Sequence, residues 1–253
     1  MKIESFSRPF DLIIFDLGST LIFFNADWEE VLNRAEQSLV DFIVDQIKAI
    51  DKDQFKLSLH NTLMNYYQQR EIDLVEASMV TVLCSVFDEY GIESMSDAFV
   101  KEALLSFYSI SQEQWFIEDD SIATLEYLKD NNYRLAILSN AGDDDDVMML
   151  VKNAQLTSYF EHVITSAKVG FRKPDPRIYQ ELLNLMDVPA SRAAMVGDTL
   201  NADIKGAQNV GIYSIWIKRR ADRSENWEHE NKIIPDATIS VLGELPLLLE
   251  NLR

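Results

Sequence analysis

The chain has 253 residues, enough for one α/β domain with an insertion or for two small domains. Apolar residues make up 47% of the sequence, which allows a sizeable core and excludes an intrinsically disordered chain. The 23 basic and 42 acidic residues give a formal charge of −19, so we expect no nucleic-acid partner and no anionic membrane surface, whereas divalent cations would be attracted.

The first predicted elements are one strand and a long helical span. Residues 11–16 form a short apolar run that ends on an acid, which predicts a buried parallel strand. Between residues 26 and 110 the apolar residues recur at helical spacing, and no strand is needed. The span predicts a compact helical subdomain with helices around 32–47 and over 51–70, 74–90 and 96–109.

After residue 115 the predicted helices and strands alternate. This alternation predicts an α/β fold with a doubly wound parallel sheet. We expect a core domain formed by residues 1–24 and 112–253 and an all-helical cap domain formed by residues 25–111. The predicted helices cover 119–131, 144–154, 175–187, 202–209 and 244–252, and the predicted strands cover 134–138, 162–165, 193–196, 213–217 and about 237–241.

Polar residues follow several of the predicted strands. Right-handed crossovers place the carboxyl ends of all parallel strands on one edge of the sheet, where such folds bind ligands. Each polar residue alone has an ordinary structural interpretation as a turn former, a helix N-cap or a surface lysine. Their ordered recurrence favours a site at that edge, with the helical span above it as a lid. The residues are Asp16, Ser139, Asn140, Lys173, Asp198 and Asp203.

This set of side chains suits phosphoryl transfer. A carboxylate such as Asp16 attacks phosphorus when the phosphate charge is neutralised and the geometry is in line. A hard divalent cation neutralises that charge and prefers oxygen ligands, which Asp16, Asp198 and the carbonyl of Gly18 would supply. Lys173 and the Ser139 hydroxyl would then hold the remaining phosphoryl oxygens.

Four segments resemble the four ordered motifs of the haloacid dehalogenase-like hydrolases, the HAD superfamily. They are residues 15–21, 138–140, 170–179 and 196–203, and the resemblance extends over nearly the whole chain, including the helical insertion between the first two motifs. It implies a Rossmann-like sheet beneath a mobile cap. Most members are magnesium-dependent phosphatases, so the resemblance implies Mg²⁺ as the cofactor and a small phosphorylated metabolite as the substrate.

The resemblance also implies roles for the matching residues. Asp16 would be the nucleophile that forms an aspartyl-phosphate, and Thr20 would orient the first loop through a hydrogen bond. Ser139 and Lys173 would bind phosphoryl oxygens, and Lys173 would also offset the charge of Asp16. Asn140, which follows Ser139 in many members, would contact either the substrate or the backbone of a loop.

The implied metal site combines the first and fourth motifs. Mg²⁺ would be bound by Asp16, by the Gly18 carbonyl and directly by Asp198, while Asp203 would support these ligands from behind.

Gly18 departs from the pattern of the family. Most of its phosphatases have a second Asp at this position, which protonates the leaving group and then activates water. Gly18 lacks this acid/base group, which typically contributes about 10²–10⁴-fold to the rate. On sequence distance alone, Asn25 and Asp27 are candidates to replace it.

Two other hydrolase types of the family are alternatives. Haloacid dehalogenases need no metal and typically have Tyr two residues after the nucleophile, with Ser and Asn in the fourth motif. Gly18, Asp198 and Asp203 count against this type, although Lys173 and Tyr179 keep a spacing seen in dehalogenases. Phosphonate hydrolases have a small residue at the Gly18 position and a Schiff-base lysine in the cap. The cap lysines considered are Lys48, Lys52 and Lys56, which we interpret as solvated helix residues.

A third alternative belongs to another class, a HAD-fold protein that binds a phosphorylated ligand or a protein partner with little turnover. The missing acid/base group supports this alternative. The retention of Asp16, Lys173, Asp198 and Asp203 opposes it.

Substrate selection in this family depends on cap residues that close over the site. Most cap aromatics, among them Tyr66, Tyr67 and Tyr108, are expected to pack in the core of the cap. Arg70 is the cap charge that we expect to be a candidate contact for a substrate anion.

The compartment follows from the cysteine count and from the absence of targeting signals. The single cysteine, Cys84, excludes an internal disulfide, and residues 1–10 show no signal-peptide pattern. No uncharged stretch approaches the roughly 20 residues needed to span a bilayer. We therefore expect a cytoplasmic protein.

Overall fold

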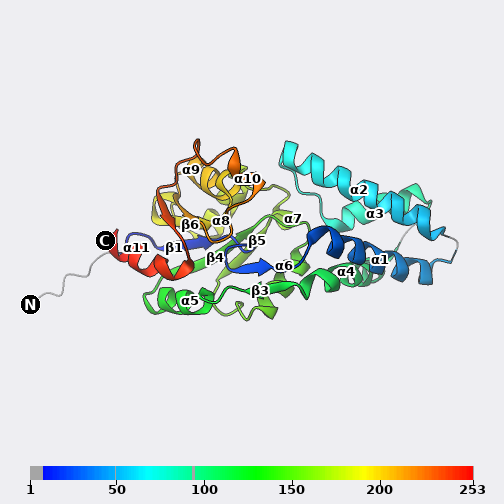
Figure 1. Ribbon diagram of the computed structural model, residues 1–253, viewed down its shortest axis with the longest axis horizontal. Helices are drawn as coiled ribbons and strands as arrows, with labels where there is room; N and C mark the ends of the chain where they lie inside the picture. Colours follow the sequence, from blue (N-terminus) through cyan, green and yellow to red (C-terminus); the bar gives the residue numbers. More distant parts are fainter. Residues whose placement is uncertain (1–7, 49, 93–94, 253) are drawn as a thin grey trace, which may run out of the picture.

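The computed structural model describes residues 8–48, 50–92 and 95–252, and its centre is a six-stranded sheet (Figure 1). The strand order is β5-β4-β1-β6-β7-β8, and every pair of neighbours is parallel. The predicted α/β fold with a doubly wound parallel sheet is therefore confirmed. The strands are β1 (Leu12–Phe15), β4 (Arg134–Ser139), β5 (His162–Thr165), β6 (Ala193–Gly197), β7 (Tyr213–Ile217) and β8 (Ala237–Ile239).

The strand β1 lies between two other strands because its four residues are apolar and fully buried. From β1 the chain builds the sheet outward through β4 and β5 and then returns to β6 on the opposite side of β1. Such a reversal opens a crevice at the carboxyl ends of the strands. The register pairs Phe15 with both Ile137 and Val196, which brings the ends of β4 and β6 level with Asp16.

Alternate residues of β1 face opposite layers of helices. Ile13 and Phe15 belong to one hydrophobic cluster, and Leu12 and Ile14 belong to another. Both faces of the sheet are thus covered, as strands without polar residues require. The first cluster includes α5 (Ser121–Asp130), α6 (Asp144–Asn153) and α11 (Leu245–Asn251), and the second includes α8 (Pro176–Met186) and α9 (Gly206–Asn209).

The helical segment, as we call residues 25–114, contains four helices with a hydrophobic cluster of their own. Each helix begins after an Asp or Ser whose side chain accepts a backbone hydrogen bond. The third helix begins five residues later than predicted, because residues 74–78 form a linker that pairs with the segment around Phe171. The helices are α1 (Trp28–Gln46), α2 (Lys52–Asp73), α3 (Met79–Glu89) and α4 (Asp97–Gln112).

Two short strands that the sequence did not predict connect the sheet to the helical segment (Figure 1). They are β2 (Ile22–Phe24) and β3 (Trp115–Ile117), which pair antiparallel with Phe24 opposite Trp115. Strands of three residues are too short to show an alternating pattern. Both connections of the helical segment therefore run side by side through one ribbon.

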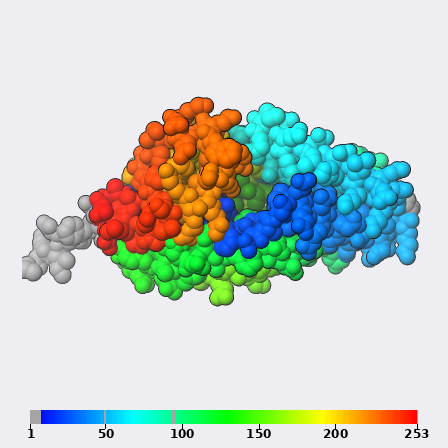
Figure 2. All heavy atoms as spheres, viewed as in Figure 1, coloured from blue at the N-terminus to red at the C-terminus, as the bar shows by residue number. Residues whose placement is uncertain are grey.

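The molecule is elongated, with α1 and α2 at one end and the C-terminal segments at the other (Figure 2). The predicted helix over 202–209 begins at Leu200 as a π-helical turn, η2 (Leu200–Lys205), that continues into α9. Short helices α7 (Ser166–Val169) and α10 (Ser224–Trp227) and the 3₁₀ turns η1 (Ala190–Arg192) and η3 (Leu242–Glu244) complete the elements. Within the described ranges, no helix combines the length and the apolar character that a membrane span requires.

Candidate active site

A cavity of about 830 Å³ lies where the carboxyl ends of the central strands meet the helical segment. Residues of α1, α2 and α4 line it together with residues of the predicted motifs. The structure thus brings the polar strand-end residues to one place, beneath the helical segment. The predicted site residues that line the cavity are Asp16, Gly18, Ser139, Asn140, Lys173, Asp198 and Asp203.

Lys173 connects the first and fourth motifs. Its side chain is only 2% exposed, and Nζ donates to Asp16 Oδ1 at 2.7 Å, to Asp203 Oδ1 at 2.6 Å and to the carbonyl of Leu138 at 2.8 Å. All three ammonium protons are used, which offsets the cost of burying the charge. Burial alone would lower the pKa of Lys173, but the carboxylates of Asp16 and Asp203 outweigh this effect and raise it.

Three carboxylates converge beside Lys173. Asp16, Asp198 and Asp203 each bring one oxygen to within 4.8 Å of the others. Asp16 directly follows β1, Asp198 directly follows β6, and Asp203 lies in η2. The backbone N–H of Thr199 donates to Asp203 Oδ2 at 2.9 Å and fixes that side chain.

The neighbouring cations do not fully neutralise these carboxylates. Burial raises the pKa of Asp16, Lys173 opposes this effect, and Asp203 adds to it. Burial and then the charge of Asp16 raise the pKa of Asp198. A hard divalent cation among these oxygens would relieve the repulsion, so the donor set fits Mg²⁺ or a similar ion.

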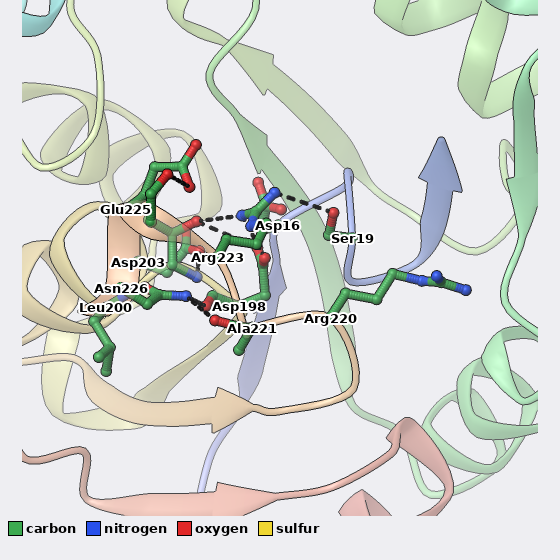
Figure 3. Close-up of polar contacts among 12 residues, drawn as sticks. Asp16, Ser19, Asp198, Leu200, Asp203, Arg220, Ala221, Arg223, Glu225 and Asn226 are labelled. Carbon is green, nitrogen blue, oxygen red and sulfur yellow. Dashed lines mark hydrogen bonds and ion pairs between the residues drawn. The ribbon is translucent and has the colours of Figure 1, made fainter. Parts of the chain in front are cut away.

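Arg223 is a charged group at the site that the sequence analysis missed. Its Nη2 donates to Asp198 Oδ2 at 2.5 Å, and its Nη1 donates to Ser19 Oγ at 3.3 Å (Figure 3). The guanidinium therefore joins the first and fourth motifs. The signal that indicates it is the basic run over 218–223, which begins at the carboxyl end of a predicted parallel strand.

The loop after Asp16 has its unusual backbone conformation at Ser19, whose φ is 60°. The φ of Gly18 lies outside the left-handed region, so glycine is not required there for backbone reasons. A Cβ on Gly18 would lie 3.3 Å from the indole of Trp115, which is a tight contact with a side chain. An aspartate at this position therefore needs a small shift of that ring.

The structure shows the surroundings of two further predicted residues, Thr20 and Asn140. The Thr20 side chain is fully buried, yet within the described part of the chain its hydroxyl has no hydrogen-bond partner. The predicted hydrogen bond of Thr20 is therefore not found, and backbone hydrogen bonds within residues 17–22 hold the loop instead. Asn140 Nδ2 donates to the Lys173 carbonyl at 2.9 Å, and Asn140 Oδ1 accepts from the Lys173 N–H at 2.8 Å. Its amide thus contacts the backbone of the loop that carries Lys173, and Asn140 and Ser139 both line the cavity.

Tyr179 supports the fourth motif from below. Its side chain is fully buried, does not line the cavity, and donates its hydroxyl proton to the carbonyl of Ala202. A Cβ on Gly206 would lie 2.3 Å from the Tyr179 hydroxyl oxygen, and a Cβ on Gly197 would lie 2.3 Å from Cγ of Asp203. These two glycines allow the close packing that directs Asp203 toward Lys173.

The candidates for a replacement acid/base group lie outside the cavity. Asn25 does not line it, and Asp27 serves as the N-cap of α1 by accepting from the Glu30 N–H.

Lys52 forms an ion pair with Asp41 at 2.5 Å on the surface. The lysines Lys48, Lys52 and Lys56 of the helical segment likewise do not line the cavity.

Asp146 is a cavity carboxyl group that the sequence analysis did not select as a site residue. It lies in the first turn of α6, where the Asp143 side chain caps the helix by accepting from the Asp146 N–H. Gln112 Nε2 donates to Asp146 Oδ1 at 2.8 Å. Burial raises the pKa of Asp146 to about 7, because no cation compensates the charged form.

The fold and the site define an α/β enzyme in which an aspartate at the end of a sheet strand contacts a buried lysine and further carboxylates. The family model of the haloacid dehalogenase-like hydrolases matches residues 10–211, and the chain belongs to this family of hydrolases. The predicted family is thereby confirmed. Arg223 lies beyond the matched residues.

Individual proteins of known name are similar to parts or to all of the chain. A glyceraldehyde 3-phosphate phosphatase of Pyrococcus abyssi is 38% identical over 91 residues, which are 36% of this chain and 38% of that protein, so the match spans well under half of that relative. A HAD phosphatase from Thermococcus onnurineus has a TM-score of 0.62 and 26% identity, with coverage of 94% of this chain and 97% of that one. A 2-haloacid dehalogenase from Pseudomonas syringae has a TM-score of 0.67 and 25% identity, with coverage of 96% and 100%.

Proposed function

We propose that the protein is a phosphatase of small phosphorylated metabolites that acts through an aspartyl-phosphate on Asp16. The observation that carries this proposal is the Lys173 ammonium, which joins Asp16 and Asp203 at 2.7 and 2.6 Å beside Asp198. This arrangement combines a carboxylate nucleophile with a positive group for phosphoryl oxygens. The similarity to a glyceraldehyde 3-phosphate phosphatase and to a HAD phosphatase supports the same reaction.

Asp16 performs the first step of the proposed reaction. Its carboxylate attacks phosphorus, which forms an O–P bond on Asp16 and breaks the P–O bond to the leaving alcohol. The leaving oxygen takes up a proton from solvent. A water molecule then attacks the phosphorus of the aspartyl-phosphate and gives a proton to solvent, the O–P bond to Asp16 breaks, inorganic phosphate is released and the carboxylate is restored.

We propose that Lys173 and the Ser139 hydroxyl bind the phosphoryl oxygens during both steps, for which the Lys173 ammonium must release one of its three acceptors. Both residues line the cavity and are nearly buried, at 3% and 7% exposure, so water screens their interactions little. Asn140 holds the backbone of Lys173 and thereby positions its ammonium. We further propose that residues 25–111 act as a cap over a core of residues 1–24 and 112–253.

The proposal includes Mg²⁺. We assign Asp16, Asp198 and the Gly18 carbonyl as its ligands, with Asp203 supporting them. When bound, the ion supplies the positive charge that allows one anion to attack another. Arg223 must then share or release the Asp198 carboxylate, since its Nη2 lies 2.5 Å from Oδ2.

The decisive experiment compares hydrolysis of p-nitrophenyl phosphate and of a panel of phosphorylated metabolites by wild type, Asp16→Asn and Asp119→Asn. Asp16→Asn is nearly isosteric and should lower kcat at least 1000-fold, because an amide is a poor nucleophile; removing a nucleophile in other enzymes costs about 10⁶-fold. The exposed Asp119 lies outside the cavity, so its variant should retain wild-type rates. Excess chelator should stop hydrolysis, and added Mg²⁺ should restore it.

Other outcomes would favour the alternatives. Release of halide from a 2-haloacid in excess chelator, without hydrolysis of any phosphate ester, would favour a dehalogenase. Binding of phosphorylated ligands without turnover would favour a binding protein. Wild-type rates for Asp16→Asn would contradict the proposed nucleophile.

A further inference from the structure

Arg70 is a cavity residue of the helical segment whose guanidinium has few partners. It lies near the C-terminal end of α2 and lines the same cavity as Asp16 and Lys173. Its Nη1 lies 3.4 Å from the Tyr66 hydroxyl and 3.5 Å from Glu76 Oε1, at the outer limit of hydrogen bonding. Its Nε is buried and has no hydrogen-bond partner among the residues that the structure describes.

The nearby carboxylates are engaged by another arginine. Arg172 donates from Nη1 to Glu76 and from Nη2 to Glu71 Oε1 at 2.7 Å, and Ser166 Oγ donates to Glu76 at 2.6 Å. Arg70 Nε, by contrast, lies 3.7 Å from Glu71 Oε1. The two arginines and two glutamates are balanced in charge, but of the two arginines only Arg172 donates short hydrogen bonds to these carboxylates, and Glu76 accepts further short ones from Ser166 and Tyr66. Arg70 thus keeps free N–H donors beside the cavity.

Two aromatic rings hold the Arg70 guanidinium in place. Its Cζ lies 4.5 Å from the ring centroid of Tyr67 and 5.1 Å from that of Tyr66. Such cation–π contacts fix the plane of the guanidinium without using its N–H groups. A donor group fixed before binding loses less conformational entropy when a ligand arrives.

From these contacts we infer that Arg70 binds a second anionic group of the substrate, either a carboxylate or a second phosphate. The planar guanidinium matches both groups through paired hydrogen bonds. The phosphoryl site has its own cation in Lys173, so Arg70 serves a separate group on the far part of the same molecule. This inference rests on the proposed phosphatase function and assigns phosphate monoesters with a distal anion as the preferred substrates.

The test compares three substrates with one three-carbon frame: phosphoglycerate, glycerol bisphosphate and glycerol phosphate. The first carries a distal carboxylate, the second a distal phosphate and the third a distal hydroxyl. Wild type should hydrolyse at least one anionic member with a kcat/KM at least tenfold above that of glycerol phosphate. The preferred anionic member identifies which of the two groups Arg70 binds.

The variants are Arg70→Gln, Arg70→Lys and, as a matched control, Arg34→Gln. Arg70→Gln should lower the preference for the anionic member over glycerol phosphate at least tenfold, mainly through KM. Arg70→Lys keeps the positive charge but loses the planar pair of N–H donors, so its preference for the anionic member should lie between those of Arg70→Gln and wild type. Arg34 is exposed on α1 and does not line the cavity, so Arg34→Gln should keep the wild-type preference.

The outcomes separate the subsite from the phosphatase function. Equal kcat/KM for the three substrates in wild type, or equal losses on all three in Arg70→Gln, would overturn the subsite while p-nitrophenyl phosphate is still hydrolysed. If no ester is hydrolysed, the phosphatase function fails. Titration calorimetry of Asp16→Asn with the same three compounds then decides the subsite without turnover. If Arg70→Gln does not fold, the subsite is tested by Arg70→Lys instead, through the same ratio of kcat/KM for the anionic member to kcat/KM for glycerol phosphate.

Discussion

Gly18 has no acid/base side chain at the position two residues after the nucleophile. Its backbone conformation is open to any residue, and the nearest atom to an added Cβ belongs to the Trp115 indole at 3.3 Å. Without a proton donor there, the leaving alcohol departs with more negative charge. The proposed reaction should therefore depend strongly on the pKa of the leaving group.

Gly18→Asp tests this dependence. The new carboxyl group should increase hydrolysis of alkyl phosphates more than hydrolysis of aryl phosphates, because aryl leaving groups need less protonation. We expect the alkyl-to-aryl ratio of kcat/KM to rise at least tenfold, which is less than the roughly 10²–10⁴-fold that a fully positioned acid/base group contributes. Steady-state kinetics with ethyl and p-nitrophenyl phosphate measure the ratio.

Gly18→Asn is the matched control, since it has the same shape and cannot exchange a proton. It should keep the wild-type ratio. An equal rise in Gly18→Asn, or an unchanged ratio in a folded Gly18→Asp variant, would show that the proton comes from another group.

At the scale of elements, the linker between α2 and α3 fastens the helical segment to the loop that carries Lys173. The Glu76 N–H donates to the Gly170 carbonyl at 3.0 Å, and the Arg172 N–H donates to the Leu74 carbonyl at 2.9 Å. The side chains of Glu76 and Arg172 form a buried ion pair beside these backbone contacts. The helical segment is therefore held at this linker as well as at the β2–β3 ribbon.

Removing the charge of Glu76 should weaken this attachment. Its side chain is 0% exposed, so Glu76→Gln leaves the buried guanidinium of Arg172 with only the exposed carboxylate of Glu71. Breaking such a pair costs about 3–5 kcal/mol in the free energy of unfolding. Urea titrations followed by circular dichroism measure the change.

Glu71→Gln is the control for the same arginine. The Glu71 side chain is 63% exposed, and exposed ion pairs contribute about 0–1 kcal/mol. A loss of similar size in both variants would contradict the importance of the buried pair.

The sheet could be predicted from the sequence because five of its six strands are apolar runs of four to six residues, and all six alternate with helices. The two strands of the ribbon could not, since each has three residues and is stabilised by its partner across the gap. The start of α3 was also predicted too early. Leu74 ends α2 in a left-handed backbone conformation, and the next residue, Val75, forms a β-bridge with Phe171 of the α/β part. This contact is remote in sequence, so local helical spacing could not predict where α3 begins.

The candidate site was predictable to the extent that it lies at strand ends. Asp16, Ser139, Asp198 and Lys173 follow from the alternation of elements and from spacing within the motifs. The basic run over 218–223 indicates a cation at this edge of the sheet, but the contact of Arg223 with Asp198 depends on the path of a loop. Likewise, nothing in the sequence decides whether the amide of Asn140 contacts the substrate or the backbone of a loop.

For the molecule as a whole, the acidic composition makes stability depend on pH. Asp146 makes the free energy of unfolding decrease as pH rises, because burial raises its pKa from 3.8 to about 7. The folded chain binds this proton more tightly than the unfolded chain does. The stability contribution is therefore fully present below the unfolded pKa and decreases as pH rises toward the folded pKa.

Asp146→Asn should remove this dependence. Between pH 5.5 and 8.5, the wild type should lose about 2 kcal/mol of unfolding free energy through Asp146, and the variant should not. Urea unfolding at several pH values measures both curves, and the range stays above the pI of about 4.5. Parallel curves for the two proteins would show that Asp146 is ionised in the fold without cost. Asp145→Asn, whose side chain is 70% exposed, serves as the control and should follow the wild type.

The β2–β3 ribbon has a consequence for how the chain folds. The strands β1 and β4 pair Leu12 with Arg134, which are 122 residues apart in sequence. Since Phe24 lies opposite Trp115, the intervening 90 residues leave and return at one point. Once the helical segment has folded around its own hydrophobic cluster, its two ends are held close together. The pairing of β1 with β4 then costs only the loop-closure entropy of a much shorter chain. The β1–β4 pairing is remote in sequence, but during folding it then forms like a contact between residues that are close in sequence.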